Sequence, residues 1–246
     1  MNGMARPIPP LLEVEDLHVA YGKAHVVHGV SFTVRAGEFV VMLGRNGAGK
    51  STILHALSGL VPKRAGRVRF AGEDITRSGP KEIVQAGLVQ VLEGHRVFTS
   101  LTVEDNLLVG TYARGANDRE AKLERLYADF PEIAEKRHQP ASRLSGGQQQ
   151  ILAIAQGMIA EPRLLILDEP SGGLAPIVID RILDVASRLA QDGVAILLVE
   201  QLVEKALRHA SYGYLLETGA IGGEGTSAEL GDSALLRRIY LGGESA

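Results

Sequence analysis

A glycine-rich segment, Gly44-Arg-Asn-Gly-Ala-Gly-Lys-Ser51, constrains this chain more than any other feature. Residues 38 to 43, apolar from residue 39 on, precede it and predict a short buried strand, and residues 51 to 60 follow with apolar side chains at helical spacing. A strand, a glycine-rich turn ending in Lys-Ser and a helix are the expected context of a phosphate-binding loop. Glycines let the backbone turn successive N–H groups inward, and the positive end of the helix dipole attracts anions.

Lys50 and Ser51 have specific expected roles around a bound triphosphate. Lys50 supplies a positive charge to the β- and γ-phosphates, and the Ser51 hydroxyl is expected to bind Mg²⁺. A glycine-rich turn without a ligand would not explain why Lys and Ser follow the strand. ATP and Mg²⁺ are therefore the predicted cofactors, and the predicted nucleotide-binding residues here are Gly44, Arg45, Asn46, Gly47, Ala48, Gly49, Lys50, Ser51 and Thr52.

An apolar strand predicted over residues 164 to 167 ends in two carboxylates, Asp168 and Glu169. Ligands bind at the carboxyl ends of strands in open α/β folds, so both side chains are expected beside the phosphate loop. Asp168 would hold Mg²⁺ directly or through water, and Glu169 would polarise the attacking water. A strand followed by an acidic turn is the structural alternative, and the phosphate loop upstream favours the functional interpretation.

A second glycine-rich helix start occurs in Leu144-Ser-Gly-Gly-Gln148. Its hydroxyl and its turn at the head of a helix form another potential anion site, predicted to comprise Ser145, Gly146, Gly147 and Gln148. One chain then has two phosphate-binding helix ends but a single Lys-bearing loop. The simplest interpretation is that the second site serves a nucleotide held by another copy, and an ordinary Ser-Gly N-cap is the alternative.

Together the three motifs resemble those of ATP-binding cassette (ABC) subunits, and the resemblance extends over nearly the whole chain. Alternating strand and helix patterns already indicate a parallel α/β core. The resemblance implies an α/β fold with a P-loop NTPase (RecA-like) parallel-sheet core, an N-terminal antiparallel β subdomain and a helical insertion. A single ABC ATPase domain is expected over 11–246, with core segments 11–93 and 161–246, a helical subdomain 94–160 and a flexible N-terminus 1–10.

Residue roles also follow from this resemblance. Tyr21 would stack on adenine, and Ser145 with its glycines would contact the γ-phosphate bound to the opposite subunit. The segments 93–98, 170–176 and 199–201 resemble ATPases of high-affinity branched-chain amino-acid importers, and urea and short-amide importers share much of this pattern. The implied partners are a second ATP-binding subunit, in a homodimer or a heterodimer, and membrane permease subunits.

Three positions depart from the common ABC pattern. Glu93 stands where the metal-sensing loop usually has Gln, and Gln90, inside a predicted strand, is a poor substitute. Gln201 replaces the usual γ-phosphate-contacting His, and His209 lies too far along the chain to compensate.

These departures decide the predicted roles. Glu169 and Lys50 are the predicted catalytic residues, and Gln201 is predicted to sense the γ-phosphate. Glu93 joins Ser51 and Asp168 as a candidate metal ligand. Ala175 replaces an interface-crossing Asp, which leaves that role to the backbone or Ser171.

Composition excludes several other functions. With 26 basic and 29 acidic side chains, the chain has no basic excess for nucleic acid. The absence of cysteine excludes disulfides, zinc thiolates and cysteine nucleophiles. No stretch approaches the roughly 18–20 apolar residues of a membrane span, and no secretory signal is present, so a cytoplasmic subunit is expected at the inner face of the membrane through permease subunits. Candidate permease contacts are Val97, Phe98 and Leu101, with burial in the core as the alternative.

The same motifs are also compatible with three other functions of the chain. An ABC protein could power an exporter or lipid extraction, or act on DNA or the ribosome without transport. Those non-transport proteins usually need a long coiled-coil insertion or two cassettes, and this chain has neither. A regulatory module that binds ATP without cleaving it is a third alternative: Glu169 argues against it, and Gln201 keeps it open.

Overall fold

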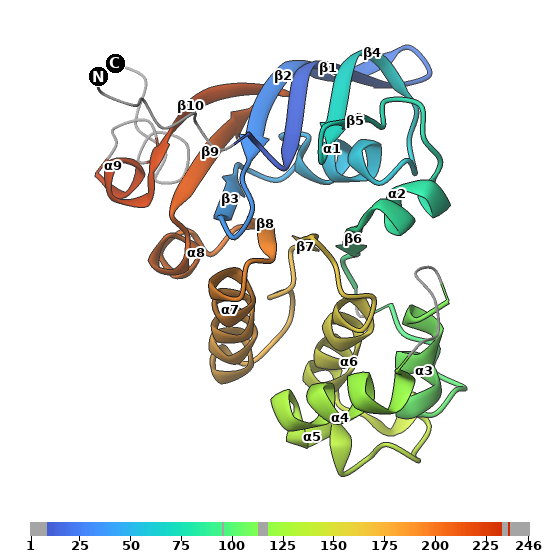
Figure 1. The fold of residues 1–246 in the computed structure, drawn as a ribbon. Helices are drawn as coiled ribbons and strands as arrows, with labels where there is room; N and C mark the ends of the chain where they lie inside the picture. The colour runs from blue at the N-terminus through green and yellow to red at the C-terminus, as the bar shows by residue number, and fades with distance from the viewer. Residues whose placement is uncertain (1–8, 95, 113–117, 233–235, 237–246) are drawn as a thin grey trace, which may run out of the picture.

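The computed structural model describes residues 9–94, 96–112, 118–232 and 236, and its centre is a mostly parallel sheet (Figure 1). In spatial order this sheet contains β10 (Ala220–Thr226), β9 (Tyr212–Glu217), β3 (Phe39–Leu43), β8 (Ala195–Glu200), β7 (Leu164–Asp168) and β6 (Leu88–Val91). Only the edge strand β10 runs antiparallel to its neighbour. The predicted parallel α/β core is confirmed.

A smaller antiparallel sheet covers one face of the core. It contains, in spatial order, β2 (Ala24–Val34), β1 (Leu12–Tyr21), β4 (Lys63–Phe70) and β5 (Glu73–Asp74). The N-terminal antiparallel β subdomain that the resemblance implied is present. Ala71 and Gly72 both have positive φ, 54° and 85°, and this left-handed pair reverses the chain between β4 and β5.

The helices fall into two spatial groups (Figure 1). Those around the sheets are α1 (Lys50–Leu57), α2 (Pro80–Ala86), α7 (Pro176–Gln191), α8 (Val203–His209) and α9 (Ser227–Gly231). The others gather at the opposite end: α3 (Val103–Gly110), α4 (Arg119–Asp129), α5 (Pro131–Ala134), a 3₁₀ turn (Ala141–Arg143) and α6 (Gly146–Met158). Helix α1 ends before the expected Leu60, because Gly59 takes a left-handed φ of 73°. None of the described helices is long and apolar enough to cross a bilayer.

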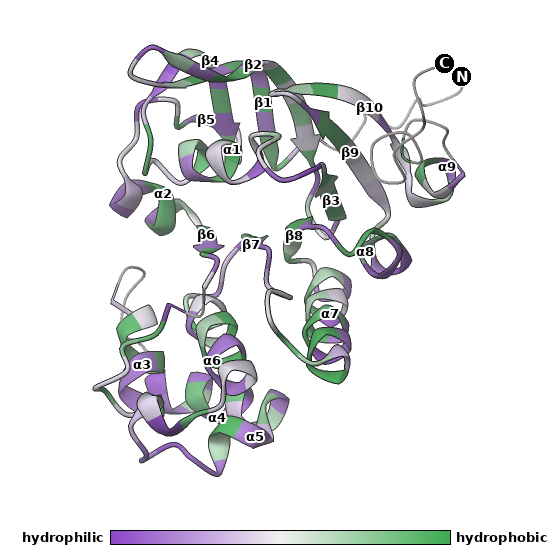
Figure 2. Cartoon of the chain, turned by 180° about the vertical axis from the view of Figure 1, so that it is seen from behind, coloured by the Kyte–Doolittle hydropathy of each residue, from purple (hydrophilic) through white to green (hydrophobic). Residues whose placement is uncertain are grey.

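Two hydrophobic clusters fill the two faces of the large sheet. Successive side chains of a strand point to opposite faces. Val40 and Met42 therefore pack with α1 and the antiparallel sheet, whereas Val41 and Leu43 pack with α6 and α7. Figure 2 shows β3 as strongly hydrophobic and α7 with both apolar and polar sides. Burial on both faces explains why the central strands are continuous apolar runs.

A buried amide, Asn106 of α3, fixes the loop that leads into the helical end of the molecule. Its Oδ1 accepts from the Phe98 N–H at 2.7 Å, and its Nδ2 donates to the Phe98 and Thr102 carbonyls at 2.9 and 2.8 Å. The Thr102 hydroxyl caps α3 by accepting a hydrogen bond from the N–H of Asp105 at 3.0 Å. Among the candidate permease contacts, Val97 packs against the core and Leu101 is half-buried, whereas Phe98 is 52% exposed.

We expect Asn106→Ala to lower the free energy of unfolding by about 2–4 kcal/mol. The substitution removes the side-chain amide that pairs with the backbone N–H and C=O of Phe98. Urea unfolding monitored by circular dichroism measures this difference. The exposed Glu124→Ala on α4 is the control and should change it by less than about 0.5 kcal/mol. Equal effects of the two variants would show that the loop does not depend on Asn106.

Candidate functional site

A pocket of about 390 Å³ lies where α1 begins and the carboxyl ends of β7 and β8 meet. This edge is where α/β sheets bind their ligands. Most of its lining residues were predicted from the sequence, and they come from five separate segments of the chain: Val26, Asn46, Gly47, Gly49, Lys50, Ser51, Thr52, Glu93, Glu169 and Gln201.

Two glycines show why this loop tolerates no ordinary side chain at their positions. A Cβ on Gly44 would lie 2.5 Å from the main-chain oxygen of Leu216 in the neighbouring β9. Gly49 is the N-cap of α1 and has a φ of 104°, in the region that glycine adopts without strain. The cap has no side chain to accept the first N–H groups of the helix, so those donors face the pocket and suit an anion.

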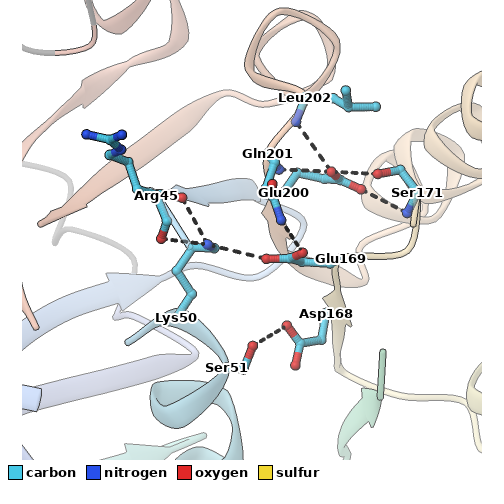
Figure 3. Close-up of polar contacts among 10 residues, drawn as sticks. Arg45, Lys50, Ser51, Asp168, Glu169, Ser171, Glu200, Gln201 and Leu202 are labelled. Atoms are coloured by element: carbon cyan, nitrogen blue, oxygen red, sulfur yellow. Dashed lines mark hydrogen bonds and ion pairs between the residues drawn. The ribbon is translucent and has the colours of Figure 1, made fainter. Parts of the chain in front are cut away.

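Lys50 is the buried cation of the pocket, with 4% of its surface exposed. Its Nζ donates to the Gly44 carbonyl at 2.9 Å and to the Arg45 carbonyl at 3.2 Å. It also lies 3.3 Å from Oε1 of Glu169 (Figure 3). The structure thus brings the predicted phosphate-binding cation and the predicted base into direct contact.

Asp168, the last residue of β7, is 2% exposed and accepts a hydrogen bond from the Ser51 hydroxyl at 3.1 Å (Figure 3). Burial raises the pKa of its carboxyl above the ordinary value, and the Ser51 hydrogen bond and the charge of His55 partly oppose that shift. The charges of Glu169 and Glu93 raise the same pKa further. The predicted metal ligands therefore lie close enough to influence one another.

Glu169 and Gln201 are also joined directly. The Gln201 side-chain amide donates to Oε2 of Glu169 (Figure 3). Glu169 has a positive φ of 44°, unusual for a residue with a side chain, and its N–H donates to the Val199 carbonyl at 3.0 Å. One carboxylate thus has Lys50 on one oxygen and Gln201 on the other, which fits a group that must be held in one orientation.

Other predicted residues lie elsewhere. Tyr21 is 49% exposed at the end of β1 and does not line the pocket. Neither do Ser145, Gly146, Gly147 and Gln148, which form the start of α6. Ser145 caps that helix: its Oγ accepts from the Gln148 N–H at 3.3 Å, and its own N–H donates to the Gln148 side chain at 3.1 Å.

Gln90 and His209, which the sequence rejected as substitutes for the usual Gln and His, form hydrogen bonds outside the pocket. The Oε1 of Gln90 accepts from the Ser58 hydroxyl at 2.6 Å, and His209 is 2.8 Å from the Ser187 hydroxyl.

The sequence did not predict Val26, which lines the pocket from β2 and has no local motif to mark it. It also missed Glu200, whose position at the end of an apolar strand beside Gln201 was a usable signal.

Comparisons with known proteins agree with this geometry. Residues 27–172 match the family model described as ABC transporter. The high-affinity branched-chain amino acid transport ATP-binding protein BraG of Pseudomonas aeruginosa is 40% identical over 95% of this chain and 100% of its own length.

The chain belongs to the ABC transporter family. It is an ATP-binding and ATP-hydrolysing subunit, and the predicted fold class is confirmed. The lipopolysaccharide export system ATP-binding protein LptB of Escherichia coli is 31% identical over 94% of this chain and 97% of its own. A crystal structure of the ADP conformation of an ABC transporter cassette superposes with a TM-score of 0.84 at 25% identity, over 96% of this chain and 100% of the other.

The raised pKa of Asp168 in this ABC ATPase predicts a pH-dependent stability. Folded Asp168 holds its proton more tightly than the unfolded chain, so the carboxylate opposes folding above its raised pKa and ceases to do so as pH falls through it. Without nucleotide and metal, Asp168→Asn should raise the unfolding midpoint at neutral pH, and the gain should shrink in acid. Thermal unfolding between about pH 4 and 8 tests this.

The exposed Asp232→Asn makes the same chemical change away from the pocket and serves as the control for this measurement. A constant difference between Asp168→Asn and the native protein at every pH would contradict the burial argument.

Proposed function

We propose that this ABC ATPase hydrolyses ATP with Glu169 as the general base, Lys50 as the phosphate-binding cation and Gln201 as the sensor of the γ-phosphate. The direct contact of Glu169 with both other side chains is the observation that carries this assignment. The loop from Gly44 to Thr52 would hold the phosphates, with α1 directed at them. Phosphoryl transfer asks for positioning and charge neutralisation more than for covalent chemistry, and this constellation supplies both.

The residues at this edge fit Mg²⁺. Hard cations prefer oxygen ligands, and Mg²⁺ is commonly held by one or two carboxylates together with substrate phosphates. Ser51 and Asp168 would supply the first protein oxygens, and Glu93 a further carboxylate. The described residues contain no self-sufficient cluster of three or more His, Cys, Asp or Glu. When bound, Mg²⁺ would supply positive charge beside the phosphate oxygens and relieve the mutual repulsion of these carboxylates.

Hydrolysis in this proposal is an in-line displacement. A water molecule attacks the γ-phosphorus, and Glu169 accepts its proton as the new P–O bond forms. The bond to the β–γ bridging oxygen breaks, and its electron pair stays with the departing ADP. Lys50 stabilises the charge on the phosphates, and the amide of Gln201 holds the Glu169 carboxylate in place.

The start of α6 would complete the site of a facing subunit. Ser145 and its glycines lie outside the pocket of their own chain, and the N-terminus of a helix of this length suits an anion. Two subunits would clasp two ATP molecules, and hydrolysis would release them. Tyr21, half exposed at the end of β1, would stack on adenine. The helical group 94–160 would carry the motion to permease subunits through Phe98, placing the protein at the cytoplasmic face of the membrane.

Import of branched-chain or related amino acids is the transport process that we propose. The 40% identity to BraG over the full length of that protein favours it over urea, amide or export systems. The lower identity to an export ATPase shows that the same cassette serves another cargo elsewhere in the family. The ATPase subunit would therefore be paired with permeases of the branched-chain importer class.

Glu169→Gln should lower kcat for ATP hydrolysis about 10²- to 10⁴-fold, because the amide cannot accept the proton of the attacking water. Binding of ATP should persist, since the phosphate loop is unchanged. Phosphate release and binding of a fluorescent ATP analogue measure the two properties. Unchanged turnover would remove Glu169 from its role as the general base.

Mixing two inactive variants should restore activity if the subunits share their sites. Lys50→Ala removes the phosphate-binding cation of the loop. Ser145→Arg places a large side chain at the start of α6, where the nucleotide of the facing subunit would bind. A mixed pair would contain one site with both defects and one intact site, so each mixed dimer should recover about half of the native turnover. No recovery at any mixing ratio, with turnover independent of protein concentration, would contradict a shared site.

A further inference from the structure

Glu200 is a buried carboxylate for which neither the sequence motifs nor the proposed mechanism has a use. It is the last residue of β8 and is 2% exposed. Its neighbour along the chain is Gln201, and its neighbour in space is the loop that follows Glu169 (Figure 3). A buried carboxylate destabilises the folded protein unless hydrogen-bond donors surround it. Its donors therefore show which parts of the chain depend on it.

Four donors converge on this one carboxylate. Oε1 accepts from the Ser171 N–H at 3.0 Å, and Oε2 accepts from the Ser171 hydroxyl at 2.8 Å. Oε2 also accepts from the Gln201 N–H at 3.0 Å and, more weakly, from the Leu202 N–H at 3.4 Å. Hydrogen bonds to an ionised acceptor are stronger than those between neutral groups. The carboxylate therefore holds the backbone of two separate segments.

These two segments contain the proposed base and the proposed sensor. Residues 169–172 leave β7, and residues 201–202 leave β8, which pairs with β7 in parallel. A second link already joins them, the hydrogen bond from the Gln201 amide to Glu169. The Gly172 N–H donates to the Glu169 carbonyl at 3.3 Å and completes a tight turn around Ser171. Glu200 thus closes a ring of contacts around the reactive carboxylate.

We propose that Glu200 is a positioning residue, which locks the loop after Glu169 to the backbone of Gln201 so that base and sensor keep one fixed relative placement. The inference rests on the roles proposed above for Glu169 and Gln201. Glu200 is not among the residues that line the pocket, and it acts through the neighbours that it holds. A misplacement of about 1 Å at a reacting group is enough to lower a rate about 100-fold.

Glu200→Gln is the sharpest probe, because it keeps the size of the side chain and replaces one acceptor oxygen by an NH₂ group. That group would face an N–H or O–H donor of Ser171 or Gln201, and at least one link would be lost. Steady-state ATP hydrolysis by the full-length chain in its native assembly should show kcat reduced about 10- to 100-fold. KM for ATP should stay within about 3-fold, since the phosphate loop is untouched.

Glu229→Gln provides a matched control. Oε2 of Glu229 accepts from both the N–H and the hydroxyl of Thr226, each at 2.8 Å, so one hydroxyl residue supplies the same two kinds of donor at the start of α9. The same chemical change there should leave kcat at the native value. A second pair of variants covers the case in which Glu200→Gln fails to fold: Ser171→Ala should lower kcat, and Ser171→Thr, which keeps a hydroxyl, should retain more of it.

A double-variant comparison separates positioning from plain stabilisation. If Glu200 acts through Gln201, then Glu200→Gln should lower kcat by less than about 2-fold further in a Gln201→Ala background, since coupled residues are not additive. Multiplicative losses in the double variant, or a native kcat in Glu200→Gln, would overturn the inference. Native turnover in Glu169→Gln would instead overturn the proposed function, so the two failures are distinguishable.

Discussion

The parallel pairing of β3, β7 and β8 is the constraint on which the rest of this structure depends. Leu43 lies opposite Glu200 and Asp168 lies opposite Val199, so the ends of three strands reach the same edge of the sheet together. A shift of one residue in a strand exchanges its two faces. In β8 such a shift would bury Gln201 and expose Glu200, so the proposed positioning residue and the proposed sensor would exchange environments. Because β8 is apolar on both faces, it is the hydrogen bonds of Glu200 and Gln201 at its polar end that disfavour such a shift.

Local patterns in the sequence predicted most of the pocket because each motif is contiguous. The phosphate loop needs its glycines at fixed steps, and Asp168 and Glu169 end an unmistakably buried strand. Prediction was weaker where a single residue decides the geometry: the left-handed Ala71 begins the turn between β4 and β5, and Gly59 ends α1 before the expected Leu60. A glycine directly after a helix is a common stop signal, so Gly59 could have been recognised from the sequence. An alanine carries no such signal, and only the folded backbone shows that Ala71 is left-handed.

Contacts between distant segments were beyond the sequence for a different reason. Val26 reaches the pocket because β2 folds over the core, and no property of a valine in a strand indicates this. Ser171 and Glu200 are 29 positions apart, and their hydrogen bonds exist only once β7 and β8 are adjacent. The family resemblance directed attention to Gln201 as the departure from the usual His, and it left the neighbouring carboxylate without a role.

The contacts of Lys50 connect nucleotide binding to the readiness of the base. An ammonium group has three N–H donors, and here its partners are the Gly44 carbonyl, the Arg45 carbonyl and Glu169. A phosphate oxygen that binds Lys50 must therefore replace one of them. The two carbonyls belong to the loop itself and are fixed by its fold, whereas the Glu169 contact joins two side chains and is the one free to change. Under the proposed roles, arrival of the phosphate takes Lys50 from Glu169 and leaves that carboxylate held by Gln201 alone, so the base becomes available only when the group it must act on is in place.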